Sequence, residues 1–284
     1  MTTLKEKAKR FYDLHHQTGR ILVLPNGWDV ITARVFEEAG FPAVATSSGA
    51  VSTSLGYPDG QKITRQEMLG AVERMSHALT VPLSADMEAG YGKSDEEMAE
   101  LVRGLINAEA VGLNIEDSTG DPQRPLEDIE VQCQKIRALR KSSEEEGNGV
   151  HLFINARTDA FYTMSDKSAA LEEAVARGRA YREAGADCIF VMRARDAGSI
   201  SEIVKRLNCP INIILGSGSP SITELERIGV ARVSFGTSMV RASIAAMKNI
   251  ASGLKEGKTY DEIFTSAITY DELNRLSQPA GKNL

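Results

Sequence analysis

The chain has 284 residues, of which 42% are hydrophobic and 25% charged, and this composition is typical of a folded protein with one large core. Its net charge of -6 argues against a nucleic-acid surface, and the sequence has no run of about 18 apolar residues that would predict a membrane helix. We therefore expect a cytoplasmic protein with no membrane or nucleic-acid partner.

Short apolar runs alternate with longer helical patterns along the chain. An N-terminal helix is expected first, and the helical patterns that follow include two with capping-box spacing, at Ser94 with Glu97 and at Ser221 with Glu224. The strand candidates, in chain order, are ILVLPN from 21, AVATS from 43, VPLSADME from 81, GLNIED from 112, HLFINART from 151, CIFVMR from 188, INIIL from 211 and RVSFG from 232.

Eight apolar strands separated by single helices predict a (β/α)₈ TIM barrel, with a doubly wound open sheet as the alternative. We expect one domain, residues 1–284, that ends in a helical extension from about 255 to 284. TYDE occurs there at Thr259 and again at Thr269, and both copies have capping-box spacing. The apolar side of these helices fits either the barrel itself or a neighbouring subunit of a homo-oligomer, a dimer or a tetramer.

Acidic residues gather where the third and fourth predicted strands end. Asp86 and Glu88 stand two apart in SADMEAGYG, so in a strand they would point to the same side, and Glu116 with Asp117 ends the next strand. An all-oxygen cluster of this kind suits Mg²⁺ or Mn²⁺. We predict Asp86 as the direct ligand, with Glu88 and Glu116 acting through water. The alternative is that these acids pair with lysine or arginine at a barrel rim.

Arg157 ends the fifth predicted strand and is expected on the same face. A guanidinium there would hold a carboxylate or an enolate oxygen, or would form a structural ion pair with Glu116 or Asp117. The run TSSG, residues 46–49, offers hydroxyl and backbone N–H groups for an anion. The loop that follows it, residues 49–64, is unusually long, as functional loops often are.

Together these residues resemble the isocitrate lyase and phosphoenolpyruvate mutase superfamily. The resemblance rests on SLGYPD at 54–59, ADMEAGYG at 85–92, GLNIED at 112–117 and NARTDAF at 155–161. It implies a barrel in which bound Mg²⁺ and an arginine stabilise the enolate of a pyruvate-like unit. The implied metal site is Asp86, Glu88 and Glu116. The implied catalytic residues are Arg157 and Asp59, and the implied substrate-binding residues are Ser47, Ser48, Gly49 and Arg157.

The sequence departs from the superfamily pattern after Asp117. Lyases that cleave isocitrate or 2-methylisocitrate carry a Lys-Lys/Arg-Cys-Gly-His loop there, and the mutases carry lysine and asparagine, whereas this chain reads STGDPQRPLEDIE. After the sixth strand, Arg193 stands about where the lyases have glutamate and the mutases histidine. The expected activity is therefore a Mg²⁺-dependent lyase or decarboxylase acting on a small 2-oxo acid that resembles oxaloacetate.

Several alternatives stay open. Within the superfamily they are P–C bond chemistry on phosphonopyruvate or carboxyphosphonoenolpyruvate, cleavage like that of 2-methylisocitrate lyase, and aldol chemistry like that of ketopantoate hydroxymethyltransferase. From other classes, GSGSPS and SFGTS after the last two strands fit a sugar-phosphate isomerase. A catalytically silent barrel would explain the missing loop motif.

Overall fold

The computed structural model describes residues 2–257 and 261–279. Within them, nine parallel strands form one sheet in the order β1-β9-β8-β7-β6-β5-β4-β3-β2. The strands are β1 (Leu22–Val23), β2 (Asn26–Gly27), β3 (Val44–Thr46), β4 (Leu83–Asp86), β5 (Gly112–Glu116), β6 (Phe153–Thr158), β7 (Cys188–Val191), β8 (Ile211–Ile214) and β9 (Arg232–Ser234).

The first predicted strand is present as two short segments. Pro25 has no N–H to donate, and the chain changes its pairing partner there. On one side Leu24 N–H donates to Val233 at 2.9 Å, and on the other Ala45 N–H donates to the carbonyl of Pro25 at 2.9 Å. The same stretch of chain thus joins β9 to β3, and the sheet closes into a ring. All eight predicted strands and the TIM-barrel fold are confirmed.

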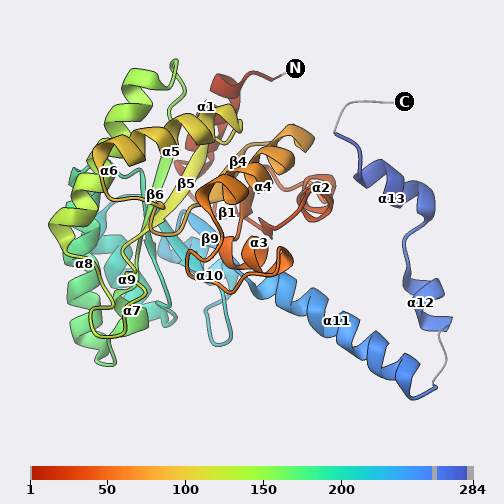
Figure 1. The fold of residues 1–284 in the computed structure, drawn as a ribbon. Helices are drawn as coiled ribbons and strands as arrows, with labels where there is room; N and C mark the ends of the chain where they lie inside the picture. Colours follow the sequence, from red (N-terminus) through yellow and green to blue (C-terminus); the bar gives the residue numbers. More distant parts are fainter. Residues whose placement is uncertain (1, 258–260, 280–284) are drawn as a thin grey trace.

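Helices surround the strands, as Figure 1 shows. Those of the barrel and its connections are α1 (Leu4–His15), α2 (Val30–Glu38), α3 (Ser48–Ser54), α4 (Arg65–Ala78), α5 (Asp95–Asn107), α6 (Ile129–Glu146), α7 (Ala160–Thr163), α8 (Lys167–Glu183), α9 (Ala197–Leu207) and α10 (Ile222–Ile228). None of the described helices combines the length and the apolar character needed to cross a bilayer.

The predicted caps are formed where the structure describes them. Ser94 and Glu97 make the full capping box of α5, and Ser221 accepts from Glu224 N–H at the start of α10. The second TYDE repeat also caps a helix, because the Thr269 side chain accepts from Glu272 N–H. The first repeat begins at Thr259, which lies outside the described residues.

Two apolar clusters hold the barrel together. The larger one fills the space between the strands and the surrounding helices. The smaller one joins the predicted N-terminal helix, α1, to the starts of the strands. There Phe11 meets Phe153 edge to face, with ring centroids 5.3 Å apart, and a Cβ on Gly112 would lie 3.0 Å from the Phe11 ring. Helix α1 therefore covers the amino ends of the strands and leaves the carboxyl ends open.

The chain leaves the barrel through α11 (Ser238–Lys255), which projects away from it in Figure 1. Two short helices follow, α12 (Asp261–Ser266) and α13 (Tyr270–Leu276). Helix α13 returns to helix α2 of the same chain, where Arg275 forms an ion pair with Glu38. Helix α13 thus contacts the barrel, but Phe264, Ile268 and Leu273 on the apolar side of these helices are exposed, so the packing of that side stays a prediction.

Candidate active site

The predicted site residues meet at the carboxyl ends of the central strands. Asp86 is the last residue of β4, Glu116 is the last residue of β5, and Arg157 lies opposite Glu116 in the register of β5 with β6. Parallel strands bring such residues to one rim of a barrel. The juxtaposition expected from the sequence is therefore present.

A cavity of about 500 Å³ opens at this rim. Five of the predicted residues line it, namely Ser48, Asp59, Glu88, Glu116 and Arg157. Asp86, Ser47 and Gly49 are not in its wall. The remaining lining residues are Gly60, Ser118, Gly120, Asp121, Pro122, Pro125, Asp159, Tyr162 and Thr163. The loop that follows β5, where the sequence departs from the superfamily pattern, thus forms part of the wall.

Asp86 is held in place by three hydrogen bonds. Its Oδ2 accepts from the backbone N–H of Ser48 at 2.9 Å and from the Ser48 hydroxyl at 2.8 Å, and its Oδ1 accepts from the amide of Asn114 at 3.3 Å. Oδ1 accepts one hydrogen bond and still has a free lone pair for a cation, whereas both lone pairs of Oδ2 are engaged by Ser48. Ser48, predicted to hold substrate, is directed at this carboxylate.

The predicted long loop, residues 49–64, is wrong in its first part, because helix α3 covers Ser48–Ser54. The other two residues of the predicted anion-binding turn, Ser47 and Gly49, lie at the start of this helix and have structural roles. The Ser47 hydroxyl accepts from Ala50 N–H at 3.4 Å, at the start of α3. Gly49 gives the loop that carries Asp59 room to approach, since a Cβ at this position would lie 2.9 Å from Asp59 Oδ2. The sequence TSSG therefore places Asp59 at the cavity and fixes Asp86.

Glu88 reaches the cavity by a route that strand alternation did not predict. Strand β4 ends at Asp86, and Glu88 has a left-handed backbone with φ of 49°. Its carboxylate accepts from the Tyr91 hydroxyl at 2.7 Å and from Gln61 N–H, and these two residues also have positive φ. Burial, followed by the neighbouring Asp86, raises the pKa of Glu88, against the lowering influence of the Tyr91 hydrogen bond.

Glu116, Arg157 and Asp159 form a compact ion-pair cluster. The Arg157 Nε and Nη2 donate to the two oxygens of Asp159 at 2.6 and 2.8 Å, and Nη1 lies 2.5 Å from Glu116 Oε2. Burial alone would lower the pKa of Arg157, but Glu116 and Asp159 outweigh it and raise that pKa. The structural ion pair with Glu116, one of the two roles expected for Arg157, is present. Two of its five N–H groups remain free for a ligand.

The Glu116 carboxyl is expected to make the unfolding free energy depend on pH. Burial raises its pKa to about 8 from the ordinary 4.5, although Arg157 opposes the shift. The folded state therefore holds a proton that the unfolded state releases above about pH 4.5, so this contribution to stability is lost as pH rises toward 8. Chemical denaturation from pH 5 to 9 should show the loss in the wild type and a smaller one in Glu116→Gln. Equal pH slopes in the two proteins would contradict the assignment.

Asp117 corrects one expectation, because it does not join the rim. It is fully buried and points to α8, where it accepts from the Tyr181 hydroxyl at 2.7 Å and pairs with Arg177 at 3.1 Å. Adjacent residues of a strand face opposite sides, so Glu116 inside the barrel places Asp117 outside it. The acidic residue that lines the cavity instead is Asp159, which the sequence analysis missed. Its position two residues after Arg157 could have indicated that it lies on the same side of the chain.

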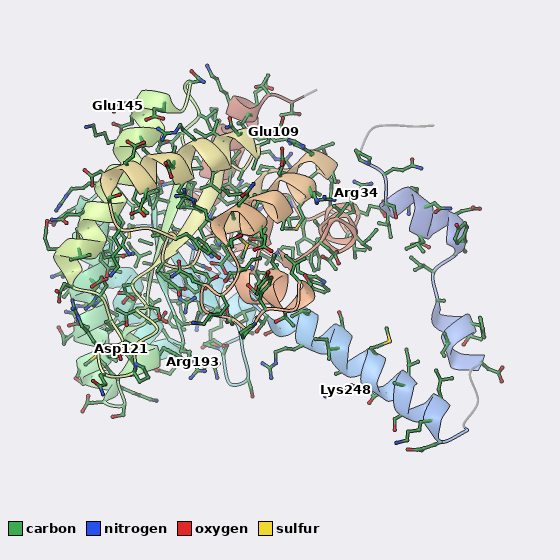
Figure 2. All side chains as sticks on the ribbon, viewed as in Figure 1. Arg34, Glu109, Asp121, Glu145, Arg193 and Lys248 are labelled. Atoms are coloured by element: carbon green, nitrogen blue, oxygen red, sulfur yellow. The ribbon has the colours of Figure 1, made fainter. Side chains whose placement is uncertain are left out.

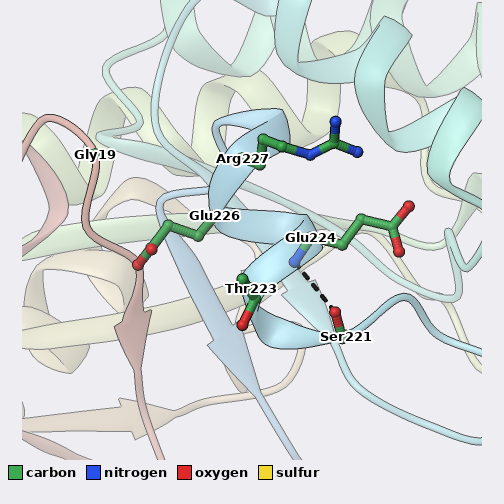
Figure 3. A pocket seen from close by; sticks show the side chains of 6 residues that line it. All are labelled: Gly19, Ser221, Thr223, Glu224, Glu226 and Arg227. Carbon is green, nitrogen blue, oxygen red and sulfur yellow. Dashed lines mark hydrogen bonds between the residues drawn. The ribbon is translucent and has the colours of Figure 1, made fainter.

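A second hollow, of about 570 Å³, lies beside α10 and the loop before β1. Figure 3 shows its lining, in which Ser221 caps the helix through Glu224. Glu226 is engaged as well, since it accepts from Ile21 N–H at 3.0 Å. This second hollow contains none of the predicted site residues. The candidate active site is therefore the cavity at the rim of the barrel.

The cavity offers oxygen donors to a metal ion. In residues 2–257 and 261–279, no three histidine, cysteine or carboxylate side chains converge closely enough to enclose an ion by themselves. Mg²⁺ typically takes one or two carboxylates directly and keeps several waters. The oxygen donors of Asp86, Glu88, Glu116 and Asp59 fit a hydrated Mg²⁺ better than zinc, which prefers nitrogen and sulfur.

Comparison with known proteins gives a family match over most of the chain. Residues 11–255 match the model of the phosphoenolpyruvate phosphomutase family. Protein Rv1998c of Mycobacterium tuberculosis H37Rv is 34% identical over 94% of this chain and 98% of its own length. The 2,3-dimethylmalate lyase of Eubacterium barkeri is 29% identical, covering 91% and 90%. Oxaloacetate decarboxylase 2 of Pseudomonas putida W619 is also 29% identical, covering 81% and 74%.

Proposed function

Because the chain belongs to the phosphoenolpyruvate phosphomutase family, within the superfamily that includes isocitrate lyase, we propose that it is a divalent-metal-dependent lyase of a small 2-oxo acid. Members of this superfamily are lyases or mutases. The proposed reaction is decarboxylation of a substrate that resembles oxaloacetate. The dimethylmalate lyase and the oxaloacetate decarboxylase share the same 29% identity with this chain but are named for different substrates, so the choice depends on the site.

The composition of the cavity wall carries this proposal. The lining described above has five carboxylates and one guanidinium, and it has no cysteine, histidine or lysine. In a decarboxylation the bond from C3 to the departing carboxylate breaks, its electron pair moves into the 2-oxo group to give an enolate, and CO₂ leaves without a proton from the protein. The enolate then takes a proton from water to give pyruvate. This reaction therefore needs no cysteine side chain to protonate a leaving group.

The protein's own residues would hold the reacting groups in place. Asp86 would bind Mg²⁺, with Glu88, Glu116 and Asp59 around its waters, and the ion would supply positive charge next to the forming enolate oxygen. The two free N–H groups of Arg157 would hold the substrate carboxylate. Asp159 and Glu116 fix the plane of that guanidinium, so that it is oriented before substrate arrives.

A screen of four candidate substrates tests the proposal. Oxaloacetate, phosphonopyruvate, isocitrate and 2-methylisocitrate are supplied separately with Mg²⁺ or with EDTA, and pyruvate, phosphoenolpyruvate and glyoxylate are measured. Pyruvate release from oxaloacetate that occurs with enzyme and Mg²⁺, but not with enzyme and EDTA, supports the proposal. Phosphoenolpyruvate or pyruvate from phosphonopyruvate selects P–C chemistry. Glyoxylate from isocitrate or pyruvate from 2-methylisocitrate selects lyase cleavage, and no product together with no oxalate binding selects a silent barrel.

We also propose that the enzyme is a homo-oligomer assembled through α11. Among the described residues of this helix, Val240 alone is buried. Ile244, Met247, Ile250 and Leu254 are all exposed, Met247 by 65%, and their spacing of three or four residues gives an apolar stripe. A helix that projects from the barrel with such a stripe is suited to a second copy of the chain.

Charges on the α11 stripe are expected to dissociate the oligomer. The double substitution Met247→Glu and Leu254→Glu places two carboxylates in the proposed contact, where burying them is unfavourable. Light scattering coupled to gel filtration should then give the monomer mass of 30.8 kDa. The control is Lys248→Glu, at the polar neighbour of Met247, which should keep the wild-type mass. A double variant with the wild-type mass would exclude this helix as the contact.

A further inference from the structure

The cavity has no uncommitted positive charge for a second anionic group of a substrate. Arg157 is the one cation in its described lining, and three of its nitrogens already face Asp159 and Glu116. Its remaining N–H groups are assigned to the carboxylate next to the 2-oxo group. A substrate with another carboxylate farther along would therefore meet the acidic side chains of the wall, Asp121 among them.

Arg193 stands next to this wall and is uncommitted. It is exposed, and in the part of the chain that the structure describes it forms no hydrogen bond or ion pair. Its guanidinium lies over the ring of Tyr162, 4.1 Å from the centroid, and Tyr162 lines the cavity. Figure 2 shows Arg193 at the same end of the barrel as Asp121. Stacking at an exposed site is weak, so an anion can draw the guanidinium away.

The backbone at Arg193 is also unusual. Strand β7 ends at Val191, and two residues later Arg193 adopts a φ of 62°, a conformation that long side chains rarely adopt. Three other non-glycine residues with positive φ, Gln61, Glu88 and Tyr91, belong to the network around Glu88. Backbone conformations of this kind persist where the surroundings enforce them, and they concentrate at ligand sites.

We propose that Arg193 binds the anionic group of the substrate that lies remote from the metal, so that the substrate is a 2-oxo acid with a second carboxylate or a phosphonate. This inference rests on the proposed function, because the metal site defines which end is remote. The planar fork of arginine suits both kinds of group, and moving from the Tyr162 ring onto the substrate would supply the missing positive charge.

Binding measurements with two ligands test the proposal. Oxalate uses both carboxylates at the metal and has no remote anion, whereas phosphonopyruvate has one. With Mg²⁺ present, Arg193→Gln should raise the Kd of phosphonopyruvate by about tenfold to a hundredfold and leave that of oxalate within about twofold. With oxaloacetate as substrate, KM should rise while kcat changes little. If phosphonopyruvate alone responds, the remote group is a phosphonate; if oxaloacetate alone responds, it is a carboxylate.

Two variants serve as controls. Arg195→Gln removes an exposed guanidinium two residues away, whose nearest partner is the carbonyl of Ser217 at 3.4 Å, and should leave both Kd values unchanged. Arg193→Lys keeps the charge without the fork and should recover part of the affinity. Equal losses for oxalate and phosphonopyruvate, or no loss for any of the remote-anion ligands, would overturn the role of Arg193 alone. A wild-type protein that binds no oxalate with Mg²⁺ would overturn the proposed function as well.

Discussion

Replacing Asp86 with alanine is expected to abolish detectable Mg²⁺ binding and to lower the rate of pyruvate release from oxaloacetate by more than about a hundredfold, since even partners of metal ligands typically contribute 10–100-fold. The structure fixes this carboxylate with two hydrogen bonds from Ser48 and one from Asn114. No other acid of the site is held by as many donors from neighbouring strands and turns. Calorimetric titration with Mg²⁺ and a pyruvate assay measure the two effects.

Glu88→Gln and Asp121→Ala provide the comparison for Asp86→Ala. A glutamine at 88 keeps an oxygen that can accept from water or from Tyr91, so its effect should be milder than the loss of Asp86. Asp121 also lines the cavity but belongs to the exposed loop, and its loss should leave Mg²⁺ affinity within a few-fold of the wild type. Wild-type turnover by Asp86→Ala in the presence of EDTA would refute the metal assignment.

Arg157→Lys is expected to lower kcat/KM by at least about tenfold, through both kcat and KM, and to lower the melting temperature. A lysine cannot reproduce the fork that meets both oxygens of Asp159 and also Glu116. Asp159 is 1% exposed, and removing the partner of a buried charge lowers the free energy of unfolding by about 3–5 kcal/mol. Arg157→Ala, which removes the whole guanidinium, should approach this loss. Steady-state kinetics and thermal unfolding give the two values.

Arg206 offers a matched control for Arg157. It also forms two hydrogen bonds to one carboxylate, from Nη1 and Nη2 to Glu172 at 2.6 and 2.8 Å, but at the protein surface and away from the cavity. Exposed pairs contribute about 0–1 kcal/mol, so Arg206→Lys should change neither kinetics nor stability appreciably. An unchanged kcat/KM in Arg157→Lys would assign Arg157 to structure alone.

The strands and the rim of the barrel were predictable because they follow from local pattern and a general rule. Apolar runs between helical patterns located every strand, and parallel strands must place Asp86, Glu116 and Arg157 at one edge. The membership of Asp117 in the cluster was predicted wrongly, although alternation alone excludes it. The substrate, metal and subunit assignments made from the sequence stay predictions.

Other features depend on contacts between segments far apart in the chain. Glu88 is turned toward the cavity by Gln61, 27 residues away, and by Tyr91, in a backbone conformation that no periodic pattern encodes. The task of Ser48 is likewise set by Asp86, 38 residues later. Its hydroxyl and N–H suggested an open anion site because the sequence cannot show which acceptor they already have.

The divided first strand has a consequence for the order in which the barrel is completed during synthesis. The backbone N–H groups of Leu22 and Leu24 donate to the carbonyls of Ala231 and Val233. These amides therefore have no strand partner on that side until a segment more than 200 residues farther along the chain has been synthesised. Contacts of such long sequence separation form slowly, because the loop between them must close first. A nascent chain that has not yet released β9 from the ribosome therefore exposes two open sheet edges, and open edges of this kind are where incomplete chains aggregate.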